Sequence, residues 1–267
     1  MEAVLAGSTP VHHPSFLASS KYIELLLLKI ALEPKYNTFM QVKILSWNIW
    51  IDSYFDQIKE FLRNSHADVI GLQEVREDDP SRETIKYLNS LGYQLVFAPT
   101  EKDWGANVND GPAVFTKYKI ISSIKYILSE EGMHAAAQAD IKIGDKILHV
   151  FSTHLTHTHQ KDSVTQLQQA EELMKHIPSE MSVLMGDFNA TPESITIQRV
   201  KTQLVDTDSK DQPTWSVYPQ GCMICNPQEI DIRLDYIFTT KDIKTHSYKV
   251  EDSKGSDHLP ISVIVEL

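Results

Sequence analysis

The chain has 267 residues, of which 42% are apolar and 23% are charged, so its composition suits one large α/β domain or two small ones. Its 36 acidic residues outnumber its 25 basic residues, and the formal charge of −11 excludes a general polyanion binder that acts through bulk charge. A nucleic-acid partner would need a local basic groove or bridging metal ions.

Residues 1–40 are predicted to form an N-terminal extension to a single domain over residues 41–267. The first 20 residues show no apolar period and indicate a flexible segment. The segment YIELLLLKIAL, residues 22–32, is shorter than the roughly 20 apolar residues that span a bilayer. Only Lys21 provides positive charge before it, which argues against a signal peptide. We expect no transmembrane segment, and a short helix that packs on the domain or, alternatively, lies on a membrane surface.

From Gln41 onward, the sequence alternates strand patterns with helical patterns. In chain order, the expected elements are strands over 42–49 and 67–75 with a helix over 54–64 between them, a helix over 81–92, strands over 93–99, 111–117, 119–128, 135–143 and 146–155, a helix over 163–177, a strand over 182–190, a helix over 191–204, and strands over 234–240 and 259–267. Gly144 and Asp145 predict a hairpin turn, and Thr191 with Pro192 predicts a helix start. Adjacent strand pairs argue against a simple βαβ repeat and favour two sheets packed face to face with helices outside.

Polar residues gather at the ends of these strands. They are Asn48, Glu74, His154, Asp187 with Asn189, Asp235, and Asp257 with His258. One such residue alone is more often a turn former or a helix cap. Six segments of this kind in one domain are poorly explained by coincidence, because ligands and catalytic groups collect where strands end and loops begin.

The residue types at these strand ends match one kind of chemistry. Glu74, Asp257, Asp187 and Asn48 offer oxygen ligands, which suit Mg²⁺ or Mn²⁺ better than Zn²⁺. His258 follows an acidic residue and could act as a general base or as an electrostatic clamp. A hard metal ion, an activated water and a cationic imidazole together suit the hydrolysis of a phosphoester.

The motifs SWNIW, GLQEV, THL, MGDFNATP, LDYIF and GSDHLPI occur in this order and resemble those of the endonuclease/exonuclease/phosphatase superfamily. The resemblance covers nearly all of residues 42–267. It implies a DNase I-like fold, a four-layer α/β sandwich in which two packed mixed β-sheets are flanked by helices. It also implies a metal-dependent phosphoric ester hydrolase that uses Mg²⁺, with Mn²⁺ as the alternative ion. Asn48 and Glu74 would then belong to the metal site, with Asp257 in support.

The same resemblance implies roles for the other strand-end residues. Asp187 would orient or deprotonate the attacking water, and Asn189 would contact the phosphate. Asp235 would orient His258. His154 matches a histidine that lies near the scissile phosphate in many members of the superfamily.

Five further residues lie outside these motifs. Cys222 and Cys225 form a lone CxxC, for which we expect two free thiols in a reducing, intracellular compartment rather than a structural zinc site. His157 and His159 could belong to a metal cluster, but we expect exposed or substrate-facing imidazoles. Trp104 lies in a polar loop, where it could stack on a substrate base or sugar or anchor the loop.

The core motifs of the superfamily define the reaction and leave the substrate open. Residues 213–238 resemble the corresponding segment of tyrosyl-DNA phosphodiesterase-type and small bacterial-type metal-dependent hydrolases. We therefore predict a monomeric phosphodiesterase that acts on nucleic acid, as a nuclease or a DNA-end-processing enzyme. The acidity and the apolar segment 22–32 support an alternative, a sphingomyelinase- or inositol-phosphatase-like enzyme for lipids or small molecules. A catalytically silent scaffold is disfavoured, because no core motif residue is replaced.

Overall fold

The computed structural model describes residues 40–77, 83–100, 110–129 and 133–267. The predicted extension over residues 1–40 lies almost wholly outside this range, and so does Trp104. The predictions for these residues therefore stay predictions. Among the described residues, no helix combines the length and the apolar character needed to cross a bilayer.

Two six-stranded sheets form the centre of the domain, and each contains both parallel and antiparallel pairs. The first sheet has the spatial order β11 (Lys244–Val250), β12 (Ile261–Glu266), β1 (Gln41–Asn48), β2 (Val69–Arg76), β4 (Asp110–Thr116) and β3 (Gln94–Phe97). The second sheet has the order β5 (Lys119–Ile127), β6 (Ala135–Ile143), β7 (Lys146–His154), β8 (Ser182–Asp187), β10 (Asp235–Thr239) and β9 (Val205–Asp206).

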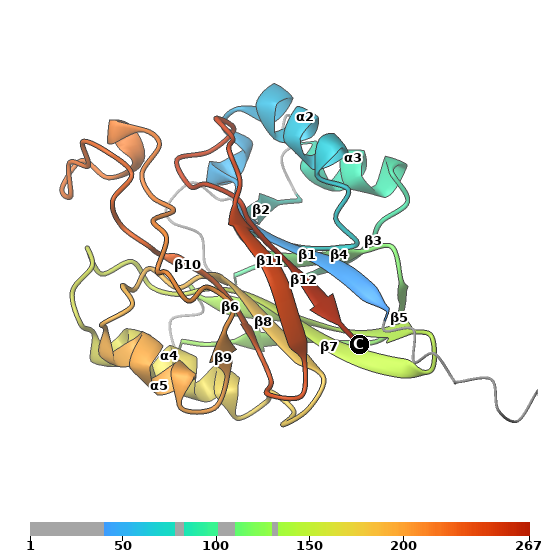
Figure 1. Ribbon diagram of the computed structural model, residues 1–267. Helices are drawn as coiled ribbons and strands as arrows, with labels where there is room; N and C mark the ends of the chain where they lie inside the picture. The colour runs from blue at the N-terminus through green and yellow to red at the C-terminus, as the bar shows by residue number, and fades with distance from the viewer. Residues whose placement is uncertain (1–39, 78–82, 101–109, 130–132) are drawn as a thin grey trace, which may run out of the picture. The chain divides into compact units, whose positions relative to one another are not determined.

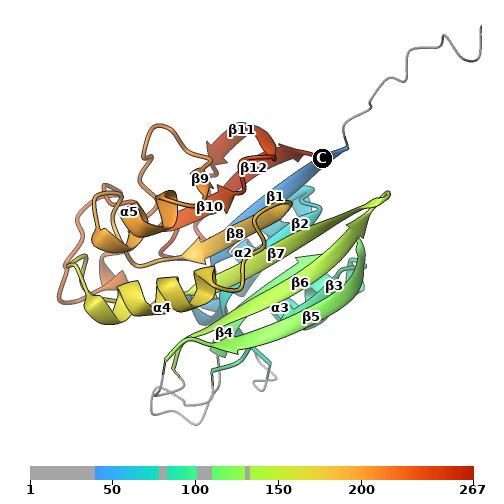
Figure 2. The same cartoon turned by 90° about the horizontal axis from the view of Figure 1, so that it is seen from below.

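Helices cover the outer face of each sheet, which gives the four expected layers (Figure 1). The described helices are α2 (Phe55–Ser65), α3 (Thr84–Ser90), α4 (Val164–Met174) and α5 (Ile195–Lys201), with short 3-10 helices η1 (Trp50–Asp52) and η2 (Pro219–Gly221). Helices α2 and α3 lie against the first sheet, and α4 and α5 against the second, as the view from below also shows (Figure 2).

Three apolar clusters correspond to the three interfaces between the layers. The central cluster joins the sheets and includes Val42 of β1 and Met185 of β8. The outer clusters seat the helices, for example Ile58 of α2 under the first sheet and Ile197 of α5 under the second. Each of these side chains is fully buried, and the burial of one contributes about 1.5–3 kcal/mol. The predicted sandwich of two sheets between helices is thus confirmed.

Three details of the predicted elements were wrong or missing, and one of them is the two-residue strand β9, which was not predicted. Helix α5 begins at Ile195 with Ser194 as its N-cap, since the Ser194 side chain accepts a hydrogen bond from the N–H of Ile197. Thr191 therefore is not the cap, and it lies in the turn that precedes the helix. Strand β11 was not predicted, because its residues are mostly polar and it lies at the exposed edge of the first sheet. The predicted hairpin at Gly144 and Asp145 is confirmed, with Ile143 opposite Lys146.

Candidate active site

The two sheets bring their strand ends to one side of the domain. Strands β1 and β2 are parallel, and β7 and β8 are parallel, so their carboxyl ends meet at the same edge. Strands β10 and β12 run antiparallel to these neighbours and begin there. In the second sheet this register places His154, Asp187 and Asp235 directly side by side on three adjacent strands. A pocket of about 310 Å³ opens at this point.

Gly186 is required by the close approach of β7 and β8. Its backbone φ is +152°, and a Cβ atom built there would lie only 2.0 Å from the carbonyl oxygen of Thr153. No side chain fits this space, so the glycine of the GDFN motif lets β8 reach the edge of the pocket next to β7. Asp187 follows at once and is 1% exposed.

Glu74 enters the pocket through a bulge in β2. The register with β4 pairs Leu72 with Ala113 and Val75 with Gly111, so two residues of β2 oppose one residue of β4. Glu74 has a φ of +59°, a left-handed conformation that costs a non-glycine residue free energy. Bulges of this kind redirect a side chain, and strained backbone is common at functional sites.

Burial raises the pKa of Glu74 from its ordinary value of 4.5 to about 7. The residue as a whole is half-buried, but its carboxyl group lies deep enough in protein for desolvation to dominate. His154 and a hydrogen bond from Asn48 oppose this rise, whereas the negative charges of Asp257 and Asp110 add to it. Burial of the carboxyl group is therefore the main reason for the raised pKa of Glu74, and the neighbouring charges are secondary to it.

Asn48 joins the two sheets at the floor of the pocket. Its Nδ2 donates to Glu74 Oε1 and to Asp187 Oδ2, each over 3.0 Å. Its Oδ1 accepts a hydrogen bond from the N–H of Trp50 over 3.0 Å. In this arrangement Asn48 presents its NH₂ group, not its oxygen, to both carboxylates.

Asp187 lies at the centre of the constellation. Its Oδ1 accepts a hydrogen bond from the N–H of Asn189 over 2.8 Å. Its Oδ2 lies 3.5 Å from His154 Nε2 and 3.5 Å from His258 Nε2. The Asn189 side chain, which is 4% exposed, donates from Nδ2 to the Leu155 carbonyl over 3.0 Å. The same Nδ2 lies 3.1 Å from His154 Nε2.

His258 and Asp235 form a buried pair beside this carboxylate. His258 Nδ1 lies 2.9 Å from Asp235 Oδ2, which also accepts a hydrogen bond from Thr214 Oγ1 over 2.6 Å. Burial opposes a charge on His258, but Asp235, Asp187 and Asp257 outweigh it and hold the pKa of the imidazole well above its ordinary value. The pair therefore keeps a cationic imidazole facing Asp187.

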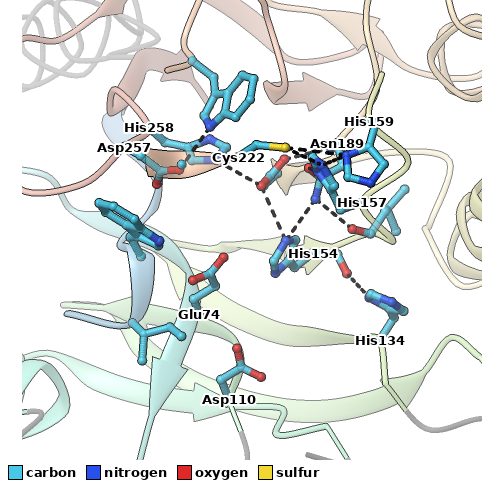
Figure 3. A pocket seen from close by; sticks show the side chains of 16 residues that line it. Glu74, Asp110, His134, His154, His157, His159, Asn189, Cys222, Asp257 and His258 are labelled. Carbon is cyan, nitrogen blue, oxygen red and sulfur yellow. Dashed lines mark hydrogen bonds and ion pairs between the residues drawn. The ribbon is translucent and has the colours of Figure 1, made fainter. Parts of the chain in front are cut away.

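Asp257 is fixed from the opposite side of the pocket. Its Oδ2 accepts a hydrogen bond from Trp215 Nε1 over 3.1 Å, and the residue is 4% exposed. In Figure 3, Asp257 and Glu74 lie on one side of the pocket, and His154 and Asn189 lie on the other side. The structure thus brings together all eight strand-end residues that the sequence singles out.

The pocket residues fit a divalent cation. The carboxylates of Glu74, Asp110, Asp187 and Asp257 line the pocket, and among the described residues that line it there is no lysine or arginine. The imidazole of His258, which also lines the pocket, is paired with Asp235. Oxygen donors in excess of cations are the ligand set that Mg²⁺ and Mn²⁺ prefer, and Glu74 and Asp257 could hold such an ion.

Several residues of the site were missed from sequence. Asp110 begins β4 and lies near Glu74 (Figure 3). Thr214 supports Asp235 through a hydrogen bond. Asp110 could have been found as a polar residue at the start of an antiparallel strand, in the same way as Asp235. Thr214 lies in irregular backbone, where no periodic signal marks it.

Two packed six-stranded sheets with an acidic pocket at their strand ends define a DNase I-like phosphoester hydrolase. The chain matches the model of the Endonuclease/Exonuclease/phosphatase family over residues 45–258 and belongs to this family, whose members generally depend on a divalent metal ion. No curated protein sequence matches the chain.

Solved structures share the fold at low sequence identity. An endonuclease/exonuclease/phosphatase from Beutenbergia cavernae DSM 12333 has a TM-score of 0.70 at 20% identity, over 85% of this chain and 72% of that chain. ANGEL2, a 2',3'-cyclic phosphatase, has a TM-score of 0.65 at 18% identity, with 87% and 97% covered. The mannosyl-6-phosphatase Bt3783 of Bacteroides thetaiotaomicron VPI-5482 has a TM-score of 0.62 at 19% identity, with 84% and 99% covered.

Proposed function

We propose that this phosphoester hydrolase is a Mg²⁺-dependent phosphodiesterase that acts on the end of a nucleic acid. One observation supports this most directly: the buried Asp187 carboxylate is held between Asn48, His154 and His258 at the edge of an acidic pocket. Such a carboxylate is placed to orient a water and to accept its proton.

The proposed roles follow from the contacts of each side chain. A divalent ion held by Glu74 and Asp257 would neutralise charge on a phosphoryl oxygen. Asn48 orients Glu74, and it could offer an oxygen to the ion only with its amide turned over. His258, kept cationic by Asp235, stabilises the negative charge that develops on the phosphate and acts as an electrostatic clamp rather than as a base.

Two further side chains complete the proposed reaction. Asn189 and His154 face each other over 3.1 Å and would contact the remaining oxygens of the phosphate. Asp187 would accept the proton of the attacking water. The intracellular location and the monomeric state stay predictions. Cys222 and Cys225 form no disulfide, which supports the predicted location.

The size and charge of the pocket favour a compact substrate. A volume of about 310 Å³ holds one phosphate with its neighbouring sugar, and no lysine or arginine among the described residues lines it to track a longer backbone. A terminal phosphodiester fits these limits better than an internal one. The same observation favours a second candidate, a small phosphoester. Of the proteins with similar folds, Bt3783 is described as a mannosyl-6-phosphatase and ANGEL2 as a 2',3'-cyclic phosphatase.

A substrate panel tests both candidates. Oligonucleotides with free, blocked and 2',3'-cyclic ends, a circular single strand, and sugar phosphates are each incubated with Mg²⁺ and then with EDTA. We expect EDTA-sensitive cleavage at the linear ends and none of the circle, and the Glu74→Gln variant serves as the inactive control. Cleavage of the circle would make the enzyme an endonuclease. Hydrolysis of sugar phosphates alone would replace the nucleic-acid proposal by the second candidate.

A further inference from the structure

Two imidazoles and two thiols meet at the rim of the pocket. His157 and His159 lie in the loop after β7, and Cys222 and Cys225 lie in the irregular segment after β9. Their four ligand atoms all lie within 4.8 Å of one another. Figure 3 shows Cys222 beside the two histidines and separate from Glu74 and Asp110.

The distances between these atoms are those of a tetrahedral ligand shell. His157 Nε2 lies 3.0 Å from His159 Nδ1 and 3.9 and 3.8 Å from the Sγ atoms of Cys222 and Cys225. His159 Nδ1 lies 3.6 and 3.3 Å from the same two sulfur atoms. A tetrahedral Zn²⁺ with ordinary bond lengths separates its ligands by about 3.3 Å for two nitrogens and about 3.6 Å for nitrogen and sulfur.

We propose that His157, His159, Cys222 and Cys225 form a Cys₂His₂ zinc site that joins the loop after β7 to the segment after β9. Thiolate and imidazole ligands select Zn²⁺ over the hard ions that suit the carboxylates of the active site. Four protein ligands fill the coordination shell, so the site is structural and leaves no position for a substrate or a water.

Contacts around the four side chains support the same assignment. The N–H of Cys225 donates to Cys222 Sγ over 3.0 Å, which stabilises a thiolate as a ligand requires. His157 Nδ1 lies 2.7 Å from Asn189 Oδ1, so its other nitrogen, Nε2, is left to face the cluster. A metal-binding histidine usually donates its second N–H in this way, which fixes its tautomer and orientation.

The first part of the segment that carries the cysteines is held by Tyr218, which stacks on Tyr54 and donates to the Lys254 carbonyl, but the cysteines lie further along it. Its own apolar cluster is small and contains Trp215, Cys222 and Leu234, with Cys225 and Ile232 at its edge. Met223 and Ile224, between the two cysteines, are 91% and 77% exposed. A structural zinc ion contributes folding free energy directly, and small units without a sufficient core commonly depend on one.

The zinc site would also stabilise the active site at two points. On one side, it orients His157, which in turn fixes the amide of Asn189. On the other side, it anchors the segment from which Trp215 reaches Asp257. His157 is then a positioning residue for the hydrolase, and this part of the inference rests on the proposed function.

Metal analysis of the purified full-length chain tests the site without any assay of activity. After dialysis against Mg²⁺-free buffer without a strong chelator, we expect one zinc ion per chain by inductively coupled plasma mass spectrometry. The Co²⁺-substituted chain should show a thiolate-to-cobalt charge-transfer band and the visible absorption of tetrahedral Co²⁺. Cys222→Ser and His159→Ala should each lower the zinc content about tenfold or more.

Two control variants separate this site from the acidic pocket. Glu74→Gln, in the pocket, and His246→Asn, on the exposed β11, should both keep their zinc. A chain that binds neither zinc nor cobalt would overturn the proposal, as would a Cys222–Cys225 disulfide found under anaerobic preparation. Zinc that is lost from Glu74→Gln but kept by Cys222→Ser would place the ion in the acidic pocket instead.

The positioning of Asn189 has its own readout. Cys225→His replaces one ligand by another and should keep both the zinc and kcat, whereas Cys225→Ser should lose both with little change in KM. If Cys225→Ser lost zinc and kept kcat, the site would be structural only. The cobalt spectrum of the unmodified chain decides the metal site even where a variant fails to fold.

Discussion

His258 Nδ1 and Asp235 Oδ2 lie 2.9 Å apart, and both residues are almost fully buried although they come from the ends of strands in different sheets. The carboxylate holds the proton on Nδ1 and raises the pKa of the imidazole. Removing the charge of Asp235 should therefore lower the pKa of His258 without moving the imidazole ring.

We expect Asp235→Asn to lower kcat by about 10²–10⁴-fold. The amide no longer stabilises the imidazolium, so the alkaline limb of the pH–rate profile should move to lower pH. The profile is measured against Asp145→Asn, a matched change in the exposed β6–β7 turn. An unchanged alkaline limb in Asp235→Asn would show that His258 does not act as a cation.

Glu74 predicts how the stability of the metal-free chain depends on pH. Its folded pKa, about 7, lies above its ordinary value of 4.5, so the folded state binds this proton more tightly than the unfolded state. Stability should therefore fall as the pH rises from about 4.5 through about 7, by up to about 3 kcal/mol.

Urea unfolding in Mg²⁺-free buffer at several pH values measures this loss. His258 contributes in the same direction, but it does so in every variant that keeps it. The comparison with Glu74→Gln therefore isolates Glu74, and this variant should lack most of the decline and be the more stable at pH 8. Added Mg²⁺ should stabilise the unmodified chain more at pH 8 than at pH 5.5, because the ion competes with the proton. Parallel curves for the two chains would contradict the raised pKa.

Gly186→Ala should destabilise the fold by at least about 3 kcal/mol, because the new methyl group would lie 2.0 Å from the Thr153 carbonyl oxygen. Gly92→Ala is the matched control, since nothing lies within 4 Å of its Cβ position and only its φ of +87° opposes the change. We expect about 1–2 kcal/mol there. The difference between the two urea midpoints measures the steric contribution, and equal midpoints would refute it.

Trp215→Phe keeps an aromatic ring in place but removes the Nε1 donor that holds Asp257. We expect the Mg²⁺ concentration for half-maximal activity to rise about tenfold, because supporting hydrogen bonds commonly have this effect on metal affinity. The reference variant is Trp47→Phe. The Nε1 of Trp47 donates to the His258 carbonyl and does not contact Asp257. A Mg²⁺ requirement that rises equally in both variants would show a general loosening of the pocket.

The strand ends explain why so much of this site could be predicted from sequence. Buried strands have a strong apolar signal, so polar residues at their ends, such as Asp187 and His154, stand out and share one edge when the strands are parallel. The polar edge strand β11 lacks this signal. The Glu74 bulge and the Gly186 contact depend on neighbouring strands, which no local pattern shows.

The cluster at the rim illustrates a second limit. The CxxC and the two histidines are separated by more than 60 residues, and each pattern alone favours unliganded side chains. Only the packing of two irregular segments brings Cys222 next to His157 and His159. Irregular segments have no period from which such proximity could be inferred.

The site is divided between two sheets, with Asn48 on one and Asp187 and Asp235 on the other, while His258 lies just before β12 of the first sheet. A buried hydrogen bond from Gln73 Nε2 of β2 to Ser152 Oγ of β7, over 3.1 Å, connects the two sheets. Neither sheet alone contains a complete set of reacting groups. During refolding from urea, hydrolytic activity should therefore return only when the two sheets pack against each other. Its recovery should come later than the recovery of secondary structure within either sheet.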